Sequence, residues 1–580
     1  MKRNRIIIAM KKTILSLWLM SIVGMCMAQE VPYSVIDVNN VRGMVLGTGN
    51  AYSNILGNDL TWEVPKGSGL SPLFQYALWV GGVDVNNQIH LAANLYNQNG
   101  RDYWMGPLNP DLGYTDEIME MMFEHVWNLT RDQINEFKTC HGQPGYVVPE
   151  DIQSWPARGN VNWGFAAEMD LAPFVDVNGD GRYNPDDGDY PDILGDQCLY
   201  FIFNDNYAGH TETGGHGLRM EVQAMVYAYD APENEYLNNT VFFHYDLINR
   251  STFDYISTYV GVWNDWDIGF GGDDYVGCNA RLGACYAYNA LEQDASYGDN
   301  SPVQLCAILA GPYIDHDGLD NLGYSGDCDG FGEYYDYNFG NGVVDDKRFG
   351  LSKFLVQSNS NDSAMGDPTS AEEVYRLLRG KWKDGSPVIY GGDGYPGSTG
   401  IGPQCSFMFP GDSDPCNYGT DGEIPDGDYN LNGDYWTEVS ACDLPGDRRG
   451  LAVMGPFTFA HEDVQPLDFA LTTVWKTDSQ SALDRVEDAV IAVKQKFTET
   501  LVAVSEQSGK TELFLRVYPN PTEDEVTIEA DGHLTVLNTF GQQLLSRVVD
   551  GQTTLNLPAG LYFVRLQNEK GCRVSKLVVK

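Results

Sequence analysis

The strongest constraint on the fold lies in the C-terminal segment 512–580, where turn residues interrupt the chain at short intervals. Tyr518-Pro519-Asn520-Pro521 forms a rigid turn, because proline fixes its φ angle and has no amide hydrogen to donate. Runs of alternating apolar and polar residues follow, separated by glycine-bearing turns such as Phe540-Gly541 and Ala559-Gly560. Short strands with such turns predict a small antiparallel β-sandwich of the immunoglobulin-like kind.

The order of these elements resembles the type A C-terminal sorting domain of proteins exported by the type IX secretion system. The resemblance rests on a lysine-capped last strand and on Tyr518, Pro519, Asn520, Pro521, Gly541, Gly560 and Tyr562. It implies a tail that the outer-membrane translocon recognises and that a sortase-like peptidase commonly removes. The rest of the protein would then be released or attached to the cell surface. The alternative is an ordinary sandwich module used for binding.

The first 28 residues are typical of a secretory signal peptide. A basic region precedes an apolar stretch from Ile14 to Met25, and the small residue Ala28 marks the expected cleavage site. The stretch is too short to span a membrane, and no later apolar run approaches that length, so the mature chain is expected to have no transmembrane segment. Translation from Met10 would give a more usual signal length, and Cys26 leaves a lipoprotein as the alternative.

Charge and composition narrow the class of protein. The 580 residues carry a net charge of -45, which repels phosphate backbones and argues against nucleic-acid binding. The 34 tyrosines and 63 glycines predict a folded, turn-rich β protein, and the length is too great for one ordinary core. We therefore expect a mainly β protein with a few helices: a large β-rich body at 29–505, a linker at 506–511 and the sandwich at 512–580.

The body is expected to contain more strands than helices. Strand-like runs rich in aromatic and β-branched residues occur at 73–80, 199–203, 220–229, 241–248, 256–263 and 469–475. Thr130 and Gln133 form a capping box that opens a short helix, and a second helix is capped near Ser370 and ends at Gly380. Apolar residues recurring every three or four positions from Leu483 to Val504 predict a long last helix that packs on the body.

The segment 176–187 has the spacing of a calcium-binding loop. Oxygen-bearing side chains stand at alternate positions of a twelve-residue stretch, and Gly181 falls where the chain must turn sharply. The predicted ligands are Asp176, Asn178, Asp180, the carbonyl of Arg182, Asn184 and Asp187. The pattern resembles loops of dockerins and thrombospondin type 3 repeats. A structural calcium ion is expected here, and an Asx-rich turn without metal is the alternative.

Other polar groupings give weaker signals. His210, Glu212 and His216 could hold zinc, but two glycines intervene and the spacing is not that of a helical zinc motif. Acidic residues at 265–274, 315–329 and 426–434 are more typical of solvated loops than of cation sites. No nucleophile elbow, phosphate-binding loop or dinucleotide fingerprint is present, so the sequence predicts no organic cofactor and leaves any catalytic residue unknown.

Cysteine usage fits an oxidising destination. Ten cysteines remain after the expected cleavage, and disulfides are plausible for an exported protein. Cys278 with Cys285 and Cys405 with Cys416 are close enough in sequence to be candidate pairs, although the connectivity stays open.

Motifs spread over most of residues 40–500 resemble those of uncharacterised type IX cargo proteins of Bacteroidota. Examples are Trp155-Pro-Ala-Arg-Gly159, Lys381-Trp-Lys-Asp-Gly385 and Gly446-Asp-Arg-Arg449. The resemblance implies no activity. Two functions therefore remain: a non-catalytic surface or extracellular module that binds a glycan or another surface partner, which the abundant Tyr and Trp favour, and a secreted hydrolase acting on polysaccharide or another polymer.

Overall fold

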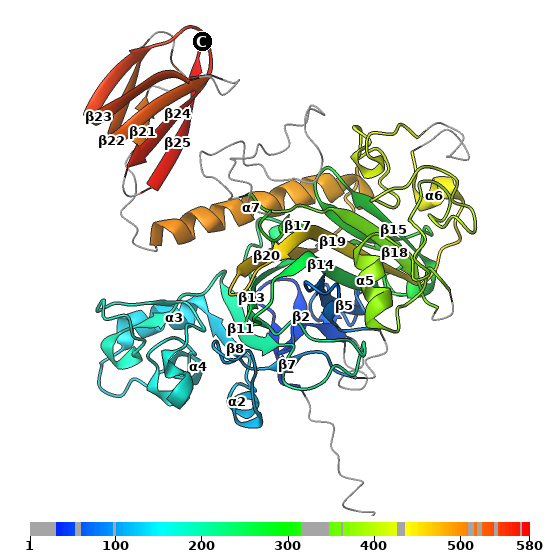
Figure 1. The fold of residues 1–580 in the computed structure, drawn as a ribbon, viewed down its shortest axis with the longest axis horizontal. Coiled ribbons are helices and arrows are strands. Elements are labelled where there is room, and N and C mark those ends of the chain that lie inside the picture. The colour runs from blue at the N-terminus through cyan, green and yellow to red at the C-terminus, as the bar shows by residue number, and fades with distance from the viewer. Residues whose placement is uncertain are drawn as a thin grey trace, which may run out of the picture.

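The computed structural model describes the chain from residue 31 onward with several gaps. The described residues are 31–52, 60–96, 100–314, 347–360, 363–425, 435–507, 515–518, 522, 525–538, 543–568 and 571–580. Strands predominate among them and helices are few, which confirms the predicted fold class (Figure 1). No helix in these ranges is long and apolar enough to cross a membrane.

A nine-stranded antiparallel sheet forms the centre of the body. Its order is β15 (Asp274–Asn279), β16 (Ala284–Asn289), β17 (Val303–Ala310), β20 (Val464–Val474), β13 (Thr240–Asn249), β12 (Met220–Ala228), β11 (Gln197–Asn204) and β7 (Trp104–Met105), with β8 (Trp127–Thr130) also paired to β11. Apolar side chains cover both faces: Phe201 and Phe203 belong to one core cluster, and Tyr200 and Ile202 to another. Burial on both sides explains why these strands read as continuous apolar runs.

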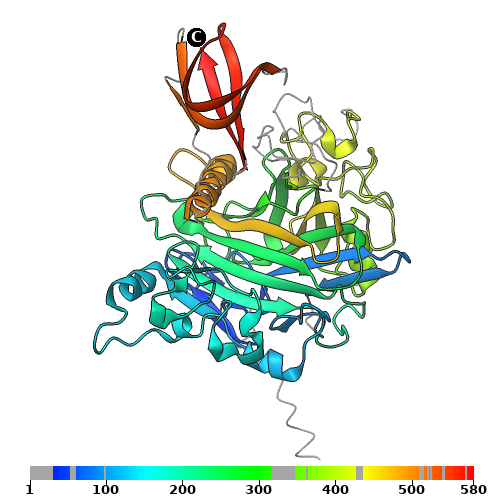
Figure 2. The same ribbon diagram turned by 60° about the vertical axis from the view of Figure 1, so that its left-hand side comes forward.

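A six-stranded antiparallel sheet packs against one face of the nine-stranded sheet (Figure 2). Its order is β18 (Lys353–Ser358), β19 (Arg448–Phe459), β14 (Tyr255–Trp266), β5 (Gln75–Val83) and β3 (Ala51–Tyr52), with β6 (Ile89–Ala93) also paired to β5. Aromatic rings fill the space between the sheets, since Tyr76 of β5 meets Phe243 of β13 edge to face at 5.1 Å between ring centroids. Phe243 in turn stacks on Phe469 at 4.4 Å. The body is therefore a large β-sandwich.

Helices cover the two outer faces. Helix α7 (Val486–Gln507) contacts β17 and β20 through Val490 and Val493, which are fully buried (Figure 1). Helix α5 (Ala371–Leu378) covers part of the outer face of the six-stranded sheet. It approaches closely because Gly261 has no side chain: a Cβ there would lie 2.9 Å from Leu378 Cδ2.

The predicted helices are confirmed. Thr130 caps α3 (Arg131–Cys140) through a reciprocal capping box with Gln133, and Ser370 caps α5. Helix α7 runs two residues into the predicted linker and is preceded by a 3-10 turn at Leu483–Arg485. The shorter helices are α2 (Glu117–Met122), α4 (Glu150–Gln153) and α6 (Glu438–Ala441), with 3-10 turns at Val161–Glu168, Pro185–Asp187, Leu237–Asn239, Gly271–Asp273 and Tyr418–Thr420.

Two small sheets complete the body. One contains β1 (Tyr33–Ile36), β2 (Arg42–Leu46) and β4 (Trp62–Glu63), and the other pairs β9 (Phe174–Val175) with β10 (Tyr190–Pro191). The second pair matters for the predicted calcium loop, because it joins the two ends of that loop.

The tail folds into antiparallel strands of its own, drawn in orange to red in Figure 1. They are β21 (Leu515–Tyr518), β22 (Glu525–Asn538), β23 (Gln543–Asn556), β24 (Gly560–Asn568) and β25 (Gly571–Val579). Strand β22 pairs with β23 along its length, with β21 through its first half and with β24 through its second half. Leu534, Val564 and Leu577 lie in its separate core. A small antiparallel β domain is thus confirmed, and the immunoglobulin-like topology stays a prediction.

Candidate functional site

The predicted calcium loop lies between β9 and β10 and is wound around Asp176. Its two carboxylate oxygens accept the amides of Gly179 and Gly181, each at 2.7 Å. Both glycines have φ of +76°, a left-handed conformation that favours glycine. The Gly181 amide is the main reason why the pKa of Asp176 lies below its usual value. The Arg182 side chain forms an ion pair with Glu168, outside the loop, at 2.7 Å.

The remaining predicted ligands contact one another. Asn178 Nδ2 donates to Asp180 Oδ2 at 3.1 Å, and Asn184 Nδ2 donates to Asp187 Oδ2 at 2.8 Å. Asn178 Nδ2 also lies 3.5 Å from Asp187 Oδ2. The fold therefore gathers these four side chains, although the carboxylates of the loop do not converge as closely as the acidic cluster described below. Calcium binding at this loop stays a prediction.

The tail residues that carry the sorting-domain resemblance are partly described. Tyr518 ends β21, and Gly560 and Tyr562 lie at the start of β24. The Tyr562 hydroxyl donates to the Pro558 carbonyl at 2.7 Å, which ties the strand to the preceding turn. Outside the described residues lie Pro519, Asn520, Pro521 and Gly541, and so do the acidic stretches 315–329 and 426–434.

The predicted His-Glu-His set does not converge. Glu212 accepts the Gly100 amide at 2.5 Å, so its carboxylate fixes backbone. His216 lies beside His90, at 6.0 Å between ring centroids. His210 points instead to Asp102 and Asp205, as described next. The zinc site is therefore not supported by the geometry of these three residues.

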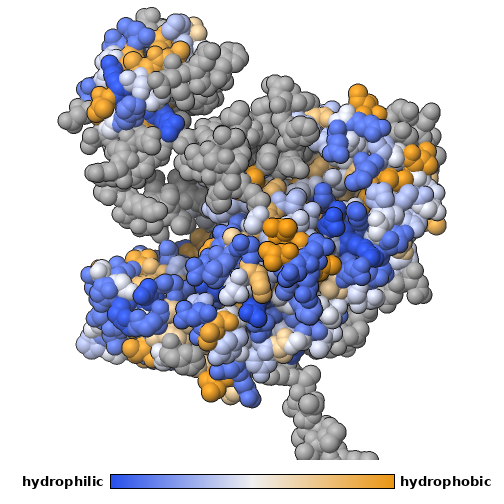
Figure 3. All heavy atoms as spheres, in the orientation of Figure 1, coloured by the Kyte–Doolittle hydropathy of each residue, from blue (hydrophilic) through white to orange (hydrophobic). Residues whose placement is uncertain are grey.

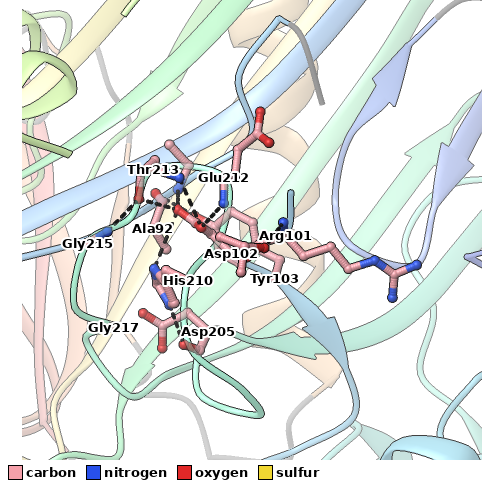
Figure 4. A network of polar contacts seen from close by, with 12 residues as sticks. Ala92, Arg101, Asp102, Tyr103, Asp205, His210, Glu212, Thr213, Gly215 and Gly217 are labelled. Atoms are coloured by element: carbon pink, nitrogen blue, oxygen red, sulfur yellow. Dashed lines mark hydrogen bonds and ion pairs between the residues drawn. The ribbon is translucent and has the colours of Figure 1, made fainter. Parts of the chain in front are cut away.

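His210 belongs to a buried network that fastens its loop to the segment after β6 (Figure 4). Nε2 donates to the Asp205 carbonyl at 2.7 Å, and Nδ1 lies 3.4 Å from Asp102 Oδ2. Asp102 also accepts the Thr213 hydroxyl at 2.6 Å and the Glu212 amide at 3.1 Å. Burial alone would lower the pKa of His210, but the carboxylates of Asp102 and Asp205 outweigh it and raise the pKa to about 9.

A second buried network lies on the outer face of the six-stranded sheet, at the end of its central strands. Gln75 of β5 is opposite Asp265 of β14, Asp265 is opposite Arg449 of β19, and Arg449 is opposite Gln357 of β18. Directly opposed residues of antiparallel strands point to the same face. Four polar side chains, each at most 1% exposed, thus form one row across four strands.

Four further residues surround the Arg449 end of this row. Arg449 Nη1 donates to Asp447 Oδ1 at 2.8 Å, and its Nε lies 3.4 Å from one oxygen each of Asp265 and Asp367. The Tyr96 ring covers the guanidinium, with its centroid 4.4 Å from Cζ. Asp267, just beyond β14, completes what we call the Arg449 cluster: Asp265, Asp267, Asp367, Asp447 and Arg449.

The carboxylates of the Arg449 cluster are electrostatically crowded. Ligand oxygens of Asp265, Asp267 and Asp447 all lie within 4.8 Å of one another, and no other such group of three His, Cys, Asp or Glu occurs in the described ranges. Burial raises the pKa of Asp265 well above its usual value, although Arg449 opposes the shift. Burial, followed by repulsion from Asp447, raises the pKa of Asp267 to about 6. It is therefore unfavourable for these carboxyl groups to be ionised at the same time.

The sequence-based interpretation of this region was wrong for Asp265 and Asp274. Both were expected in a solvated loop after a strand, but β14 continues to Trp266 and β15 begins at Asp274, so both are buried in sheets. The signal available in the sequence was the run of polar residues inside otherwise apolar strand patterns. The alignment of Asp265 with Arg449 depends on strand register, which no local pattern specifies.

The proposed cysteine pairs are also wrong. Cys278 and Cys285 face each other across β15 and β16, yet both are free, buried thiols, and Cys278 donates to the Met408 carbonyl at 3.3 Å. Cys405 is a free, buried thiol as well, whereas Cys416 forms a disulfide. Proximity in sequence therefore did not predict pairing.

We predict that the His210 network makes stability depend on alkaline pH. Its folded pKa of about 9 exceeds the unfolded value, so its contribution is complete below about pH 6.5 and is lost as pH rises through 9. At about 1.4 kcal/mol per pKa unit, the loss is of the order of 3 kcal/mol. Urea unfolding from pH 7 to 10 should show this decline, and His210→Gln should flatten it. Identical pH profiles for the two proteins would contradict the role of His210.

Comparisons with known proteins add information chiefly for the tail. No curated protein matches the chain. Among solved structures, a polysaccharide lyase matches at 7% identity and a TM-score of 0.19, over 66% of this chain and 35% of that protein. The chain thus spans about a third of the length of that protein, and a likeness at this level carries no argument about fold or function.

The tail is different. Residues 516–580 match the family described as the secretion system C-terminal sorting domain. The match runs from the second residue of β21 through β25 and lies within the predicted tail at 512–580. The predicted sorting tail is therefore confirmed, and it indicates that the type IX secretion system exports this chain to the cell surface or beyond.

Proposed function

We propose that the body is a non-catalytic binding or structural module of the cell surface or extracellular space, stabilised by calcium at 176–187. The tail would deliver it to the translocon, and a sortase-like peptidase would then remove the tail. The observation that carries the proposal is the gathering of Asn178, Asp180, Asn184 and Asp187 in one exposed loop, which places hard oxygen donors together.

The distribution of aromatic residues supports a structural role for most of them. Eight tryptophans are fully buried: Trp62, Trp79, Trp127, Trp155, Trp263, Trp266, Trp382 and Trp436. They build the cores, so they are not available to stack on sugars. Exposed aromatic side chains such as Tyr114, Phe270 and Tyr435 are the ones free to meet a glycan or a surface partner.

The surface fits a protein that works outside the cell. On the face shown in Figure 3, hydrophilic residues predominate and hydrophobic residues occur in separate groups. With a net charge of -45, such a surface keeps the protein soluble and favours cations near it.

A secreted polymer hydrolase is the second candidate, and one observation favours it. Asp267, whose pKa is raised to about 6, lies close to Asp447, and a carboxyl group with a raised pKa beside a second carboxyl group can serve as a general acid. A screen on polysaccharides discriminates between the candidates. Turnover that disappears in Asp267→Asn would support the hydrolase and overturn the non-catalytic proposal.

We predict that removal of residues 516–580 abolishes export. In a host with the type IX system, the full chain should appear on the cell surface or in the medium, and the truncated chain should remain inside the envelope. Immunoblots of cell fractions measure this. As a control, residues 506–580 fused to a carrier with a signal peptide should direct its export. Surface delivery of the truncated chain would contradict the assignment of the tail.

We predict that calcium protects the bond after Arg182 from trypsin, because a bound ion would tie the loop down and suppress local opening. Chelation should accelerate this cleavage several-fold in the full chain, as followed by mass spectrometry. Asp180→Ala should be cleaved rapidly with or without calcium. Asp186→Asn, at a loop position not predicted to bind, is the matched control and should behave as the wild type. Equal cleavage rates with and without calcium would exclude an ion in the loop.

A further inference from the structure

The Arg449 cluster has an excess of negative charge in a buried position. Arg449 contacts the carboxylates of Asp265, Asp367 and Asp447, and Lys383 lies near Asp367 as a second cation. With Asp267, four carboxylates therefore face two positive side chains. The Asp267 carboxylate makes no hydrogen bond or ion pair with another described residue. Because burying unpaired charge is costly, a further cation would stabilise this arrangement.

Buried oxygens that accept no hydrogen bond lie in the same place and point independently to a ligand. In the described part of the chain, Asp265 Oδ1 and the neutral amide oxygen of Gln75 accept no hydrogen bond, although both residues are only 1% exposed. Asp367 Oδ1 likewise accepts no hydrogen bond, and Arg449 Nε lies 3.4 Å from both it and Asp265 Oδ1. Native proteins leave few such atoms, and three oxygens of this kind in the row and its immediate surroundings indicate bound water or an ion.

The spacing of the oxygens fits one ion. Calcium binds oxygen at about 2.3–2.6 Å, so two ligands on opposite sides of it are up to about 5 Å apart. The ligand oxygens of Asp265, Asp267 and Asp447 stay within 4.8 Å of one another. The side chain of Asp447 is 32% exposed, so the cluster has an edge open to solvent through which an ion can enter.

We propose that Asp265, Asp267 and Asp447 form a calcium site on the outer face of the six-stranded sheet, distinct from the loop at 176–187. The donors are all oxygens, which hard cations prefer, whereas zinc and copper sites favour nitrogen and sulfur. Arg449 then acts as a positioning residue: it holds Asp447 by a hydrogen bond and Asp265 by an ion pair. The ion joins the end of β14 to the start of β19.

The test separates this site from the loop. In a loop variant of the full chain, Asp176→Asn and Asp180→Asn together remove the predicted loop site. Calcium binding to this variant is measured by isothermal titration and by metal content after dialysis. This loop variant should bind about one calcium ion per chain and gain thermal stability from it. Adding Asp267→Asn should weaken binding at least about tenfold and remove the thermal gain. Asp273→Asn, in the same acidic segment but outside the cluster, is the matched control and should retain both.

Because Asp267→Asn removes a crowded charge, it should fold at least as well as the parent in the absence of calcium. Asp447→Asn, at the solvent edge, is a second variant with the same expected loss of affinity. Unchanged calcium affinity in both variants would overturn the cluster site, and so would the absence of any calcium from the loop variant. Neither of these two results tests the sorting tail or the loop at 176–187. The loop has its own test, which is trypsin cleavage after Arg182.

Discussion

The face-to-face packing of the two large sheets is the constraint on which the rest of the body depends. Tyr76 of the six-stranded sheet meets Phe243 of the nine-stranded sheet, and Phe243 stacks on Phe469 within its own sheet. Once these faces are joined, the nine-stranded sheet still has an apolar outer face, which α7 and α3 cover with residues such as Val490 and Phe137. The helices are therefore a consequence of the sandwich, because they bury the apolar face that sheet packing leaves uncovered. This requirement is visible in the sequence as their amphipathic patterns.

The outer face of the six-stranded sheet meets a different requirement. Near its middle, Trp79 and Trp263 stack at 5.6 Å under the cover of α5. At the end of the same strands, the row from Gln75 to Gln357 replaces apolar packing with polar side chains that are just as deeply buried. A polar row in this position costs stability unless its charges are balanced. The balance offered by Arg449 is incomplete, and this imbalance is the reason for assigning a cation to the cluster.

Local patterns predicted those parts of the fold that local interactions determine. The Thr130 capping box, the apolar stripe of α7 from Val486 to Phe497 and the alternating strands of the tail each involve residues close in sequence, and they were found as expected. Leu483, the first residue of the predicted stripe, lies instead in the preceding 3-10 turn and is exposed. The order of strands in the sheets was beyond such reasoning, because β14 pairs with β5 and β19, which are far away along the chain.

The candidate sites divide in the same way. The loop at 176–187 is contiguous, so its spacing alone indicated calcium. The Arg449 cluster draws Asp265, Asp367 and Arg449 from three distant segments, and the register of β14 and β19 is what sets Asp265 opposite Arg449. The same limit explains the cysteines: Cys278 and Cys285 lie opposite each other, but their thiols are in the core, where the Cys278 thiol has a carbonyl acceptor instead of a disulfide partner.

The confirmed sorting tail indicates how the chain leaves the cell, and the Arg449 cluster is the proposed calcium site of its body. A crystal structure of the full chain grown with calcium, with anomalous diffraction data, tests this most directly. The account predicts an anomalous peak among Asp265, Asp267 and Asp447, at about 2.3–2.6 Å from their oxygens. Ordered water alone at that position, in crystals saturated with calcium, would contradict it.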